Sequence, residues 1–403
     1  MDSYLEKWSL DPEIDYLNHG AFGACPIVVQ LRQQELRDRM EREPFQFLTR
    51  VMQPLIDESR EALGNLIGAA PENLALVGNA TAGVNAVLRS RDVELGPKDE
   101  ILVTNLGYNA CNNAARYVAE RTGSVVRLAE IPFPLSSSEE VVTAIEAAVT
   151  DQTRIAIVDH VTSGTGLKFP LEQIVPMLKQ RGIEVIVDGA HAPGMVPLAI
   201  EALGADYYTG NCHKWLCAPK GAGFLYVAPE HQDKIAPLVI SHGWNTPRQG
   251  RSRFSDVMDW PGTLDPTPWI CVKEAIEFVD SLLPGGINAL MQRNRELVLR
   301  GRNLLVEQLG VPVPAPDDMI GSLATIKLPD DPSREARLDR TTTPSPTLLI
   351  QEQLFRRYRI DVPFFSLPSH PERGFRISAQ AYNDLSQYDR LGEALKELLA
   401  EGL

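Results

Sequence analysis

The chain alternates short apolar runs with helical stretches, and this alternation constrains its fold more than any other feature. Runs typical of buried strands occupy residues 74–77, 101–104, 125–128, 154–159, 183–188 and 223–227. Patterns typical of helices lie between them, at residues 81–90, 109–118, 139–149 and 171–180. Strands that alternate with helices predict an α/β fold built on a mostly parallel sheet. Ligands of such sheets bind beyond the carboxyl ends of the strands.

The pattern changes after residue 227, and the rest of the chain predicts a smaller α+β domain. A loop-like stretch is expected at 241–266, and a polar, proline-rich stretch at 329–346 is expected to be an exposed loop. Helices and short strands are expected at 268–282, 286–309, 348–357, 360–365, 374–379 and 385–399. We therefore divide the chain into an N-terminal segment (1–25), a large α/β domain (26–265) and a small C-terminal α+β domain (266–403).

Composition narrows the classes of partner. The chain has 403 residues and a formal net charge of −14, so it has no general electrostatic attraction to nucleic acid or to an anionic membrane. It has no basic and apolar leader and no apolar run of about 20 residues, so neither a secretory signal nor a membrane span is expected. Its five cysteines are scattered, which predicts reduced thiols in a cytoplasmic protein and no metal site.

Lys214 stands in an apolar window where a surface lysine would be poorly placed. Its neighbours include Cys212, Trp215, Leu216 and Cys217. Most lysines are solvated surface charges, but a desolvated lysine loses part of its preference for the charged form. Its amine is then available as a nucleophile and a proton carrier. Both interpretations stay open on this window alone.

Polar residues follow several of the predicted strands at their carboxyl ends. They are Thr81, Tyr108, Thr162, Ser163, Asp188 and His191. The turn at 78–80 and the following Thr81 would present backbone N–H groups and a hydroxyl, which suit a phosphate, although any capped helix start shares this pattern. Asp188 ends a buried strand and needs a cationic or donor partner. A helix cap is the alternative role for Asp188.

Two short motifs carry a resemblance to a known family. Asp188-Gly189-Ala190-His191, followed by the pair His213-Lys214, resembles the signature of class V, fold-type I pyridoxal 5'-phosphate (PLP) enzymes. The string TGNCHKWLCAPKGAGFLYV at 209–227 resembles the isopenicillin N epimerase-like branch of that class. The resemblance extends over most of the chain. It implies PLP as the cofactor and a fold with a large PLP-binding domain and a smaller C-terminal domain.

The resemblance also implies roles for individual residues. Lys214 matches the Schiff-base lysine and proton shuttle, Asp188 the partner of the pyridine nitrogen, and Tyr108 the aromatic residue stacked on the ring. The other positions that match cofactor contacts are Ala80, Thr81, Ala82, Asn211 and His213 for the phosphate, His191 for the phenolic oxygen, and Thr162 and Ser163. Thr263 matches a threonine that reaches the phosphate of a second subunit, which implies a homodimer with shared active sites. Arg376 matches the arginine that takes the substrate carboxylate.

The resemblance also implies a role for the N-terminal segment and a type of reaction. Asn18 and His19 match the segment that folds over the substrate. The implied reaction acts at Cα of an amino acid or its conjugate through an external aldimine and a quinonoid, and epimerisation is the first interpretation. A C–S β-lyase acting on a cysteine conjugate is the alternative, and transamination is a further one. Epimerisation needs an acid opposite Lys214, for which Tyr108 and His19 are candidates.

Two further interpretations are disfavoured by specific features. Cysteine desulfurases carry a reactive Cys shortly before the carboxylate-binding arginine, and the stretch 361–376 contains none. A non-catalytic PLP-binding module would need a fused DNA-binding segment or a lost lysine, and the chain has neither. Arg248, Arg251 and Arg253 form a cluster that is expected to be a solvated face or, with Trp244 and Trp260, to border the substrate entrance or a second subunit.

Overall fold

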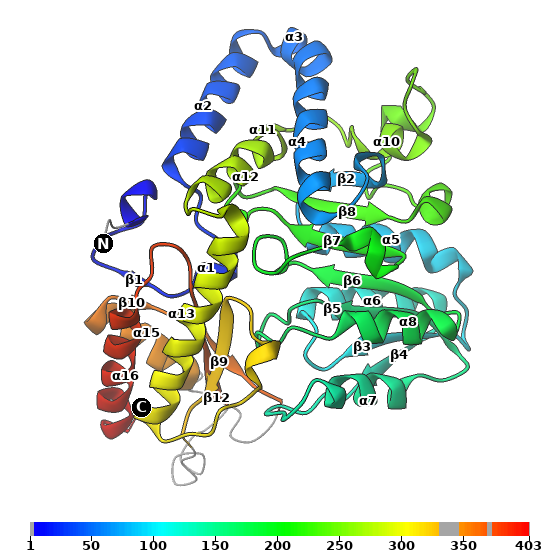
Figure 1. Ribbon diagram of the computed structural model, residues 1–403. Coiled ribbons are helices and arrows are strands. Elements are labelled where there is room, and N and C mark those ends of the chain that lie inside the picture. Colours follow the sequence, from blue (N-terminus) through cyan, green and yellow to red (C-terminus); the bar gives the residue numbers. More distant parts are fainter. Residues whose placement is uncertain (1–3, 330–345, 369–372, 403) are drawn as a thin grey trace.

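A seven-stranded sheet forms the centre of the molecule in the computed structural model, which describes residues 4–329, 346–368 and 373–402 (Figure 1). The strands lie in the order β2-β8-β7-β6-β5-β3-β4. Their bounds are Leu74–Val77 (β2), Glu100–Thr104 (β3), Val125–Ala129 (β4), Thr153–Asp159 (β5), Glu184–Gly189 (β6), Tyr207–Asn211 (β7) and Gly223–Val227 (β8). β8 runs antiparallel to both neighbours, and the other neighbouring pairs are parallel. The predicted α/β fold with a mostly parallel sheet is confirmed.

Successive side chains of the strands pack into two different core layers. In β3, for example, Ile101 lies in one layer and Leu102 in the other. Because both of their faces are buried, strands such as β3 and β8 are nearly continuous apolar runs. The helices that cover the two faces are α5 (Ala80–Arg91) and α6 (Asn109–Thr122) on one, and α7 (Glu139–Ala148) and α8 (Leu171–Gln180) on the other.

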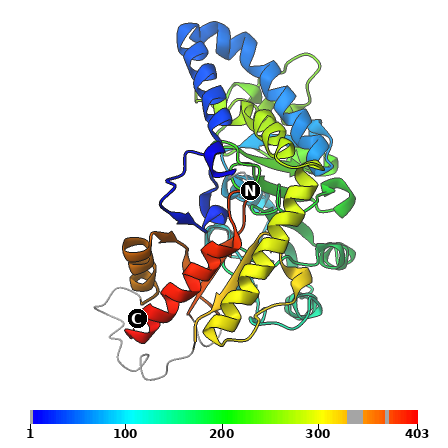
Figure 2. The same cartoon turned by 60° about the vertical axis from the view of Figure 1, so that its left-hand side comes forward.

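A helical hairpin stands above the sheet at the top of Figure 1 and again in Figure 2. It consists of α2 (Ile27–Arg42), α3 (Pro44–Gln46), a π-helical turn (Phe47–Val51) and α4 (Met52–Ile67). α12 (Val272–Ser281) packs against both long helices of this hairpin. Pro44 begins α3, as expected for a residue that is tolerated in the first turn of a helix but not inside one.

The C-terminal part of the chain forms a second, antiparallel sheet in the order β11-β12-β9. Its strands are Leu323–Lys327 (β9), Phe364–Ser366 (β11) and Arg373–Ser378 (β12). The long helices α13 (Gly286–Leu309) and α16 (Leu385–Ala400) lie side by side (Figure 2), and α13 packs on β9 and β12. α15 (Pro346–Tyr358) packs against α16 and β11. The smaller C-terminal part is confirmed, whereas its boundary near residue 265 stays a prediction.

Several short elements differ from the sequence-based expectation. β9 was not predicted, because Thr325 and Lys327 interrupt its apolar pattern although both are buried. The expected loop at 241–266 contains α10 (Arg253–Met258), whose first turn is capped by the Ser252 side chain. The remaining short elements are α1 (His19–Phe22), α9 (Ile200–Leu203), α11 (Thr267–Ile270), and the strands β1 (Asp15–Tyr16) and β10 (Ile360–Asp361), which pair with each other.

The structure tests two further expectations only over its described residues: the loop at 329–346 and the lack of a membrane span. The expected loop at 329–346 lies, apart from its two end residues, outside the described residues. Within the described ranges, none of the helices is both long enough and apolar enough to cross a membrane.

Candidate active site

A cavity of about 330 Å³ opens at the carboxyl edge of the large sheet. Its walls come from the segments that follow β2, β3, β5, β6 and β7, together with α1 of the N-terminal segment. This volume falls within the range of small-molecule sites. The predicted site residues that line it are Ala80, Thr81, Tyr108, Ser163, Asp188, His191, Asn211, His213 and Lys214. The structure thus brings most of the predicted residues to one place.

Lys214 lies in the turn between β7 and β8, where the backbone is tightly constrained. The N–H of Cys217 donates to the Lys214 carbonyl (3.0 Å), and Cys217 has a φ of 60°, which is unusual for a residue other than glycine. Lys214 keeps part of its surface open to the cavity, and its Nζ lies 2.9 Å from Nε2 of His191. Burial, followed by the charge of Arg376, lowers the pKa of Lys214 to about 7. A large fraction of the amine is therefore neutral at neutral pH.

The buried ring of His191 connects Lys214 to the core. Its Nδ1 lies 3.5 Å from the indole Nε1 of Trp215, and burial lowers the pKa of His191, so the ring is neutral. An indole N–H only donates, which makes Nδ1 the acceptor and leaves the proton on Nε2. Nε2–H then donates to the Lys214 amine, and only a neutral amine has the lone pair to accept it. This arrangement agrees with the lowered pKa of Lys214.

Asp188 ends β6, and two donors hold its carboxylate. One oxygen accepts from the N–H of Ala190 (3.0 Å), and the other accepts from the Sγ–H of Cys111 (3.1 Å). Burial, together with the charge of Asp188, raises the pKa of Cys111, so the sulfur is a thiol that donates. Cys111 lies in the first turn of α6, and no local pattern in the sequence pairs it with Asp188.

Asp159 is a cavity residue that the sequence reasoning missed. It ends β5 as Asp188 ends β6, and the two are register partners on neighbouring parallel strands. Burial, together with the charge of Asp188, raises the pKa of Asp159 well above its usual value. The raised pKa favours the protonated, neutral form of Asp159. The signal that could have found it was a second Asp at the end of an apolar strand.

The start of α5 forms the end of the cavity predicted to take a phosphate. The side chain of Asn79 accepts from the N–H of Ala82 (2.9 Å), and that of Asn211 accepts from the N–H of Ala80 (2.8 Å). Asn211 therefore ties β7 to the start of α5. Thr81 lines the same cavity, and its hydroxyl makes no hydrogen bond to another described residue. The N-terminal end of a helix with an unused hydroxyl suits an anion.

Arg376 lies on β12 behind the cavity wall. It is buried, it donates to the carbonyl of Ser163, and its guanidinium lies 5.1 Å from the ring centre of Phe365. Its Nε has no hydrogen-bond partner among the described residues. Ser163 therefore separates Arg376 from the cavity in this structure. Thr162 is buried and does not line the cavity, and its hydroxyl bonds to that of Thr165 (2.6 Å), so this geometry does not support it as a cofactor contact.

Asn18 and His19 are fixed in the N-terminal segment instead of facing the cavity. The amide of Asn18 donates to the carboxylate of Asp361 (3.2 Å). The buried ring of His19 contacts the Tyr382 hydroxyl (2.8 Å) and the backbone carbonyl of Lys214 (3.0 Å). Burial lowers the pKa of His19 to about 3. With both ring nitrogens engaged, His19 braces the Lys214 turn and is not placed to donate a proton to a substrate.

Two other predicted features lie away from the cavity. Thr263 is exposed and does not line it. The expected arginine cluster is not a free solvated face, because Arg248 pairs with Asp256 (2.7 Å) and Asp259 (3.1 Å), and Arg251 pairs with Asp259 (3.2 Å). Its third member, Arg253, lies over the Trp244 ring (4.6 Å). These arginines fasten the 241–266 stretch to itself and to α4 and do not border the cavity.

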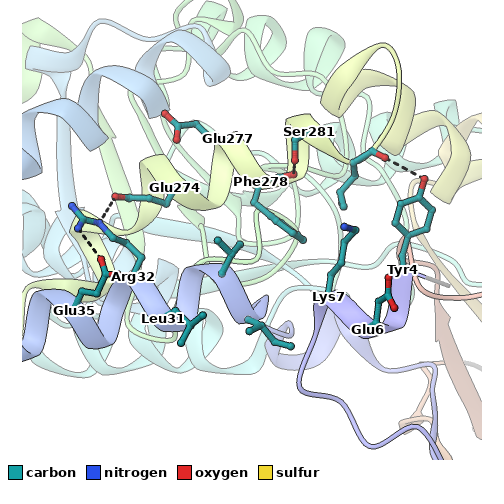
Figure 3. Close-up of a pocket in the computed structure, with 13 residues that line it drawn as sticks. Tyr4, Glu6, Lys7, Leu31, Arg32, Glu35, Glu274, Glu277, Phe278 and Ser281 are labelled. Atoms are coloured by element: carbon teal, nitrogen blue, oxygen red, sulfur yellow. Dashed lines mark hydrogen bonds and ion pairs between the residues drawn. The ribbon is translucent and has the colours of Figure 1, made fainter. Parts of the chain in front are cut away.

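A larger hollow of about 1090 Å³ lies between the N-terminal residues, α2 and α12 (Figure 3). Its wall is partly apolar, with Leu31 and Phe278 facing the space. Arg32 bonds to both Glu35 (3.2 Å) and Glu274 (2.9 Å) across one end. No predicted site residue lines this hollow, so the smaller cavity at the sheet edge is the candidate active site.

Comparison with known sequences supports the same assignment. The family model for class V aminotransferases matches residues 33–330. The isopenicillin N epimerases of Amycolatopsis lactamdurans and Streptomyces clavuligerus are 36% and 34% identical, over 98% and 97% of this chain and 97% and 96% of their own. A probable L-cysteine desulfhydrase of Arabidopsis thaliana is 28% identical over 97% of this chain and 84% of its own.

Solved structures show the same fold. The cystine C–S lyase C-DES, solved with its product cysteine persulfide, has a TM-score of 0.76 at 21% identity and covers 95% of this chain and 97% of its own. A cysteine desulfurase from Thermococcus onnurineus has a TM-score of 0.79 at 18% identity, over 100% and 99%. The resemblance stated from the sequence and its PLP cofactor are confirmed. The chain therefore belongs to the class V aminotransferase family of PLP-dependent enzymes.

Proposed function

We propose that this protein breaks the Cα–H bond of an amino acid or amino-acid conjugate and that epimerisation at Cα is its reaction. The observation that carries the proposal is the Lys214 amine, which contacts His191 and has a pKa of about 7 in a cavity that also holds Asp188. The isopenicillin N epimerases matched over nearly the whole chain support this choice of reaction.

The residues of the cavity fit PLP by their chemistry. Lys214 offers a neutral amine for the aldehyde, Asp188 a carboxylate for the ring nitrogen, and Thr81 an unused hydroxyl at a helix start for the phosphate. Tyr108 offers an aromatic ring that is 47% exposed and lines the cavity. When bound, PLP supplies an electron sink that stabilises negative charge at the substrate Cα.

Lys214 is the base in this proposal. A general base is most effective when its pKa is close to the working pH, and burial brings the Lys214 amine to about 7. His191 acts through Lys214, because its hydrogen bond to Nζ fixes the position of the amine in the cavity until a substrate displaces that contact. His191 is thus a positioning residue.

Arg376 orients the substrate in this proposal. Among the described residues it has no carboxylate partner, and its Nε makes no hydrogen bond. A buried cation without a counter-charge is unfavourable, and a substrate α-carboxylate would complete it through a bidentate contact. The substrate carboxylate can reach Arg376 only when the hydrogen bond from the guanidinium to the Ser163 carbonyl breaks. A fixed carboxylate holds the Cα–H bond in one orientation toward Lys214.

Inversion at Cα also needs a proton donor on the face opposite Lys214. Tyr108 is our candidate, because its half-exposed side chain lines the cavity and carries a hydroxyl. His19 is not, because it is buried and engaged with Tyr382 and with the Lys214 carbonyl. Tyr108→Phe is expected to keep exchange of the α-proton with solvent and to lose inversion.

A C–S β-lyase is the second candidate. It needs only the Lys214 base and a leaving group on the substrate, and the L-cysteine desulfhydrase matched over 97% of this chain favours it. Cysteine desulfurase chemistry is disfavoured because the stretch 361–376 has no Cys. Burial also raises the pKa of each of the five cysteines, so none is an activated thiolate.

One experiment separates these reactions. The holoenzyme is incubated in D2O with a panel of L-amino acids and cysteine conjugates. Deuterium at Cα with loss of optical rotation supports epimerisation, release of pyruvate and a thiol supports the lyase, and accumulation of aminated cofactor supports transamination. Lys214→Ala must abolish all three. A holoenzyme that exchanges no α-proton of any substrate would contradict the proposal.

We also propose that the protein is a homodimer. Thr263 is exposed and does not line its own cavity, as expected for a residue that serves a second subunit. Large apolar side chains on α1 to α3 are exposed as well, including Phe22 (71%), Leu31 (61%) and Phe45 (72%), and such surfaces mark interaction sites. Light scattering is expected to give twice the chain mass, and a monomer mass would contradict the proposal.

A further inference from the structure

Lys220 is the second lysine of the cavity, and the proposed reaction gives it no part. It lies six positions after Lys214 (220 − 214) in the same turn. Its ammonium donates to the carbonyl of Gly23 (3.1 Å). Among the described residues, no carboxylate lies within ion-pair distance of it. Because an ammonium has three donors, Lys220 is a cation in the cavity with donors to spare.

The backbone around Lys220 places it beside the start of α5. A Cβ added to Gly223 would lie 2.8 Å from Cα of Asn79, so the segment that follows Lys220 packs directly on the residue that caps α5. The Trp269 indole N–H donates to the carbonyls of both Val77 (3.2 Å) and Gly221 (3.0 Å), which joins the same two segments. Lys220 therefore belongs to the phosphate end of the cavity.

The charge of Lys220 also reaches the residues at this end. It contributes to the lowered pKa of His213, after burial as the main cause and the charge of Lys214. Gly23, which holds the ammonium, has a φ of 69°, and a Cβ there would lie 2.0 Å from the His213 carbonyl oxygen. Only glycine permits the N-terminal segment to lie this close to the Lys214 turn. Its carbonyl is thereby directed at Lys220.

The other groups at the phosphate end are neutral dipoles. The N–H groups of Ala80 and Ala82 already donate to side-chain oxygens. The Nδ1 of His213 lies 3.0 Å from the Ala222 carbonyl, and burial lowers its pKa to about 4, so the ring is neutral and its Nε2 carries no proton. A phosphate monoester carries a charge of about −1.5 to −2 at pH 7. The start of a helix offers only about +0.5, so these dipoles do not neutralise the phosphate.

We propose that Lys220 supplies the positive charge that holds the phosphate of the cofactor, with its ammonium shared between that phosphate and the Gly23 carbonyl. Lys214 and Lys220 are the only Lys or Arg residues among the described residues that line the cavity, and Lys214 serves the aldehyde. The inference rests on PLP as the cofactor and not on the reaction that follows. It also links phosphate binding to the position of the N-terminal segment through one ammonium.

The test compares PLP with pyridoxal, which lacks the phosphate. Dissociation constants for the apoenzyme are measured by quenching of tryptophan fluorescence for wild type, Lys220→Gln, Lys220→Arg and the exposed control Lys234→Gln. Lys220→Gln is expected to weaken PLP roughly tenfold, as for a charge-assisted hydrogen bond, and to leave pyridoxal unchanged. Lys220→Arg and Lys234→Gln should bind PLP like the wild type. Added NaCl should weaken PLP less in Lys220→Gln than in wild type.

Each alternative result has a distinct meaning. Equal PLP affinity in Lys220→Gln and wild type would overturn the role of Lys220. An equal loss of PLP and pyridoxal would also overturn it, because Lys220 would then act by holding Gly23 in place. A wild-type protein that binds neither compound would instead contradict the cofactor on which the proposed function rests.

Discussion

The two ends of the site differ in how their polar groups are satisfied. At the end built on the large sheet, the two main reacting groups have partners within the chain: Lys214 contacts His191, and Asp188 accepts from Cys111. The other end lies behind the cavity wall, in the small sheet and the N-terminal segment. Among the described residues there, buried polar atoms such as Nε of Arg376 and the amide oxygen of Asn18 lack partners.

This difference indicates that the sheet end is preorganised for chemistry, whereas the Arg376 end recognises the substrate. Buried polar groups that lack partners are unfavourable by about 1–3 kcal/mol each, so a fold retains few of them without a ligand to satisfy them. The sheet end is ready for proton transfer before a substrate arrives. The Arg376 end gains its missing contacts from a carboxylate, so substrate binding and cofactor chemistry should fail independently when each end is altered.

The largest effect is expected at the sheet end, from Lys214→Ala. Loss of the base should lower kcat roughly 10³-fold or more, and loss of the amine should abolish the visible band of the bound cofactor. Turnover and absorbance spectra measure both effects. Lys234→Ala, which removes an exposed lysine, is the matched control and should change neither. A Lys214→Ala protein with the wild-type band would contradict the assignment of this amine.

The second effect is expected at the opposite end, from Arg376→Gln. Loss of the carboxylate contact should lower kcat/KM roughly 100-fold, mainly through KM, while PLP affinity stays unchanged. Arg253→Gln, at an exposed arginine over Trp244, is the control. Steady-state kinetics and PLP titration together decide the matter. If Arg376→Gln lost PLP and substrate affinity equally, the two ends would not be independent.

A third prediction compares two neighbouring residues at the sheet end, Asp188 and Asp159. Asp188→Asn removes a charge and should lower kcat roughly 100-fold, on the scale of one electrostatic contact to the reacting group. Asp159→Asn replaces a group that is already neutral and should change kcat by no more than about threefold. Equal losses in both variants would show that Asp159 is ionised in the working enzyme.

The smallest effect concerns stability and pH. The pKa of Asp159 is raised in the folded protein, so the native state keeps a proton that the unfolded chain releases above about pH 3.9. Unfolding then releases a proton, and the free energy of unfolding falls as pH rises through this range. Asp159→Asn removes this pH-dependent loss of stability. The Tm of the variant minus the Tm of wild type should therefore increase by roughly 2 °C or more from pH 5 to pH 8. A difference in Tm that does not change with pH would contradict the raised pKa.

The sequence was most informative where a strand is wholly apolar. β2 and β8 were predicted with their observed bounds, because burial on both faces leaves no polar interruption. β7 and β9 were missed because buried polar residues break that pattern, among them Thr209 and Asn211 in β7 and Thr325 and Lys327 in β9. Periodicity reports the average environment of a segment, and it does not show polar groups that a fold satisfies through distant partners.

The candidate site was predictable to a similar extent. Lys214 and Asp188 stand at strand ends with recognisable neighbours, and both line the cavity. Asp159 carries the same signal, and its pairing with Asp188 follows only from the order of the strands. The role of His19 depends on contacts 195 and 363 positions away along the chain. Contacts of that kind cannot be inferred from local sequence.

The central claim is that the Lys214 amine is the group that bonds the cofactor. The direct measurement is reduction of the holoenzyme with borohydride, followed by proteolysis and mass spectrometry. We expect one pyridoxyl group per chain, on the peptide that contains Lys214, and the same label in the Lys220→Gln protein at saturating PLP. Absence of the label, or a label on Lys220 or another lysine, would contradict the account.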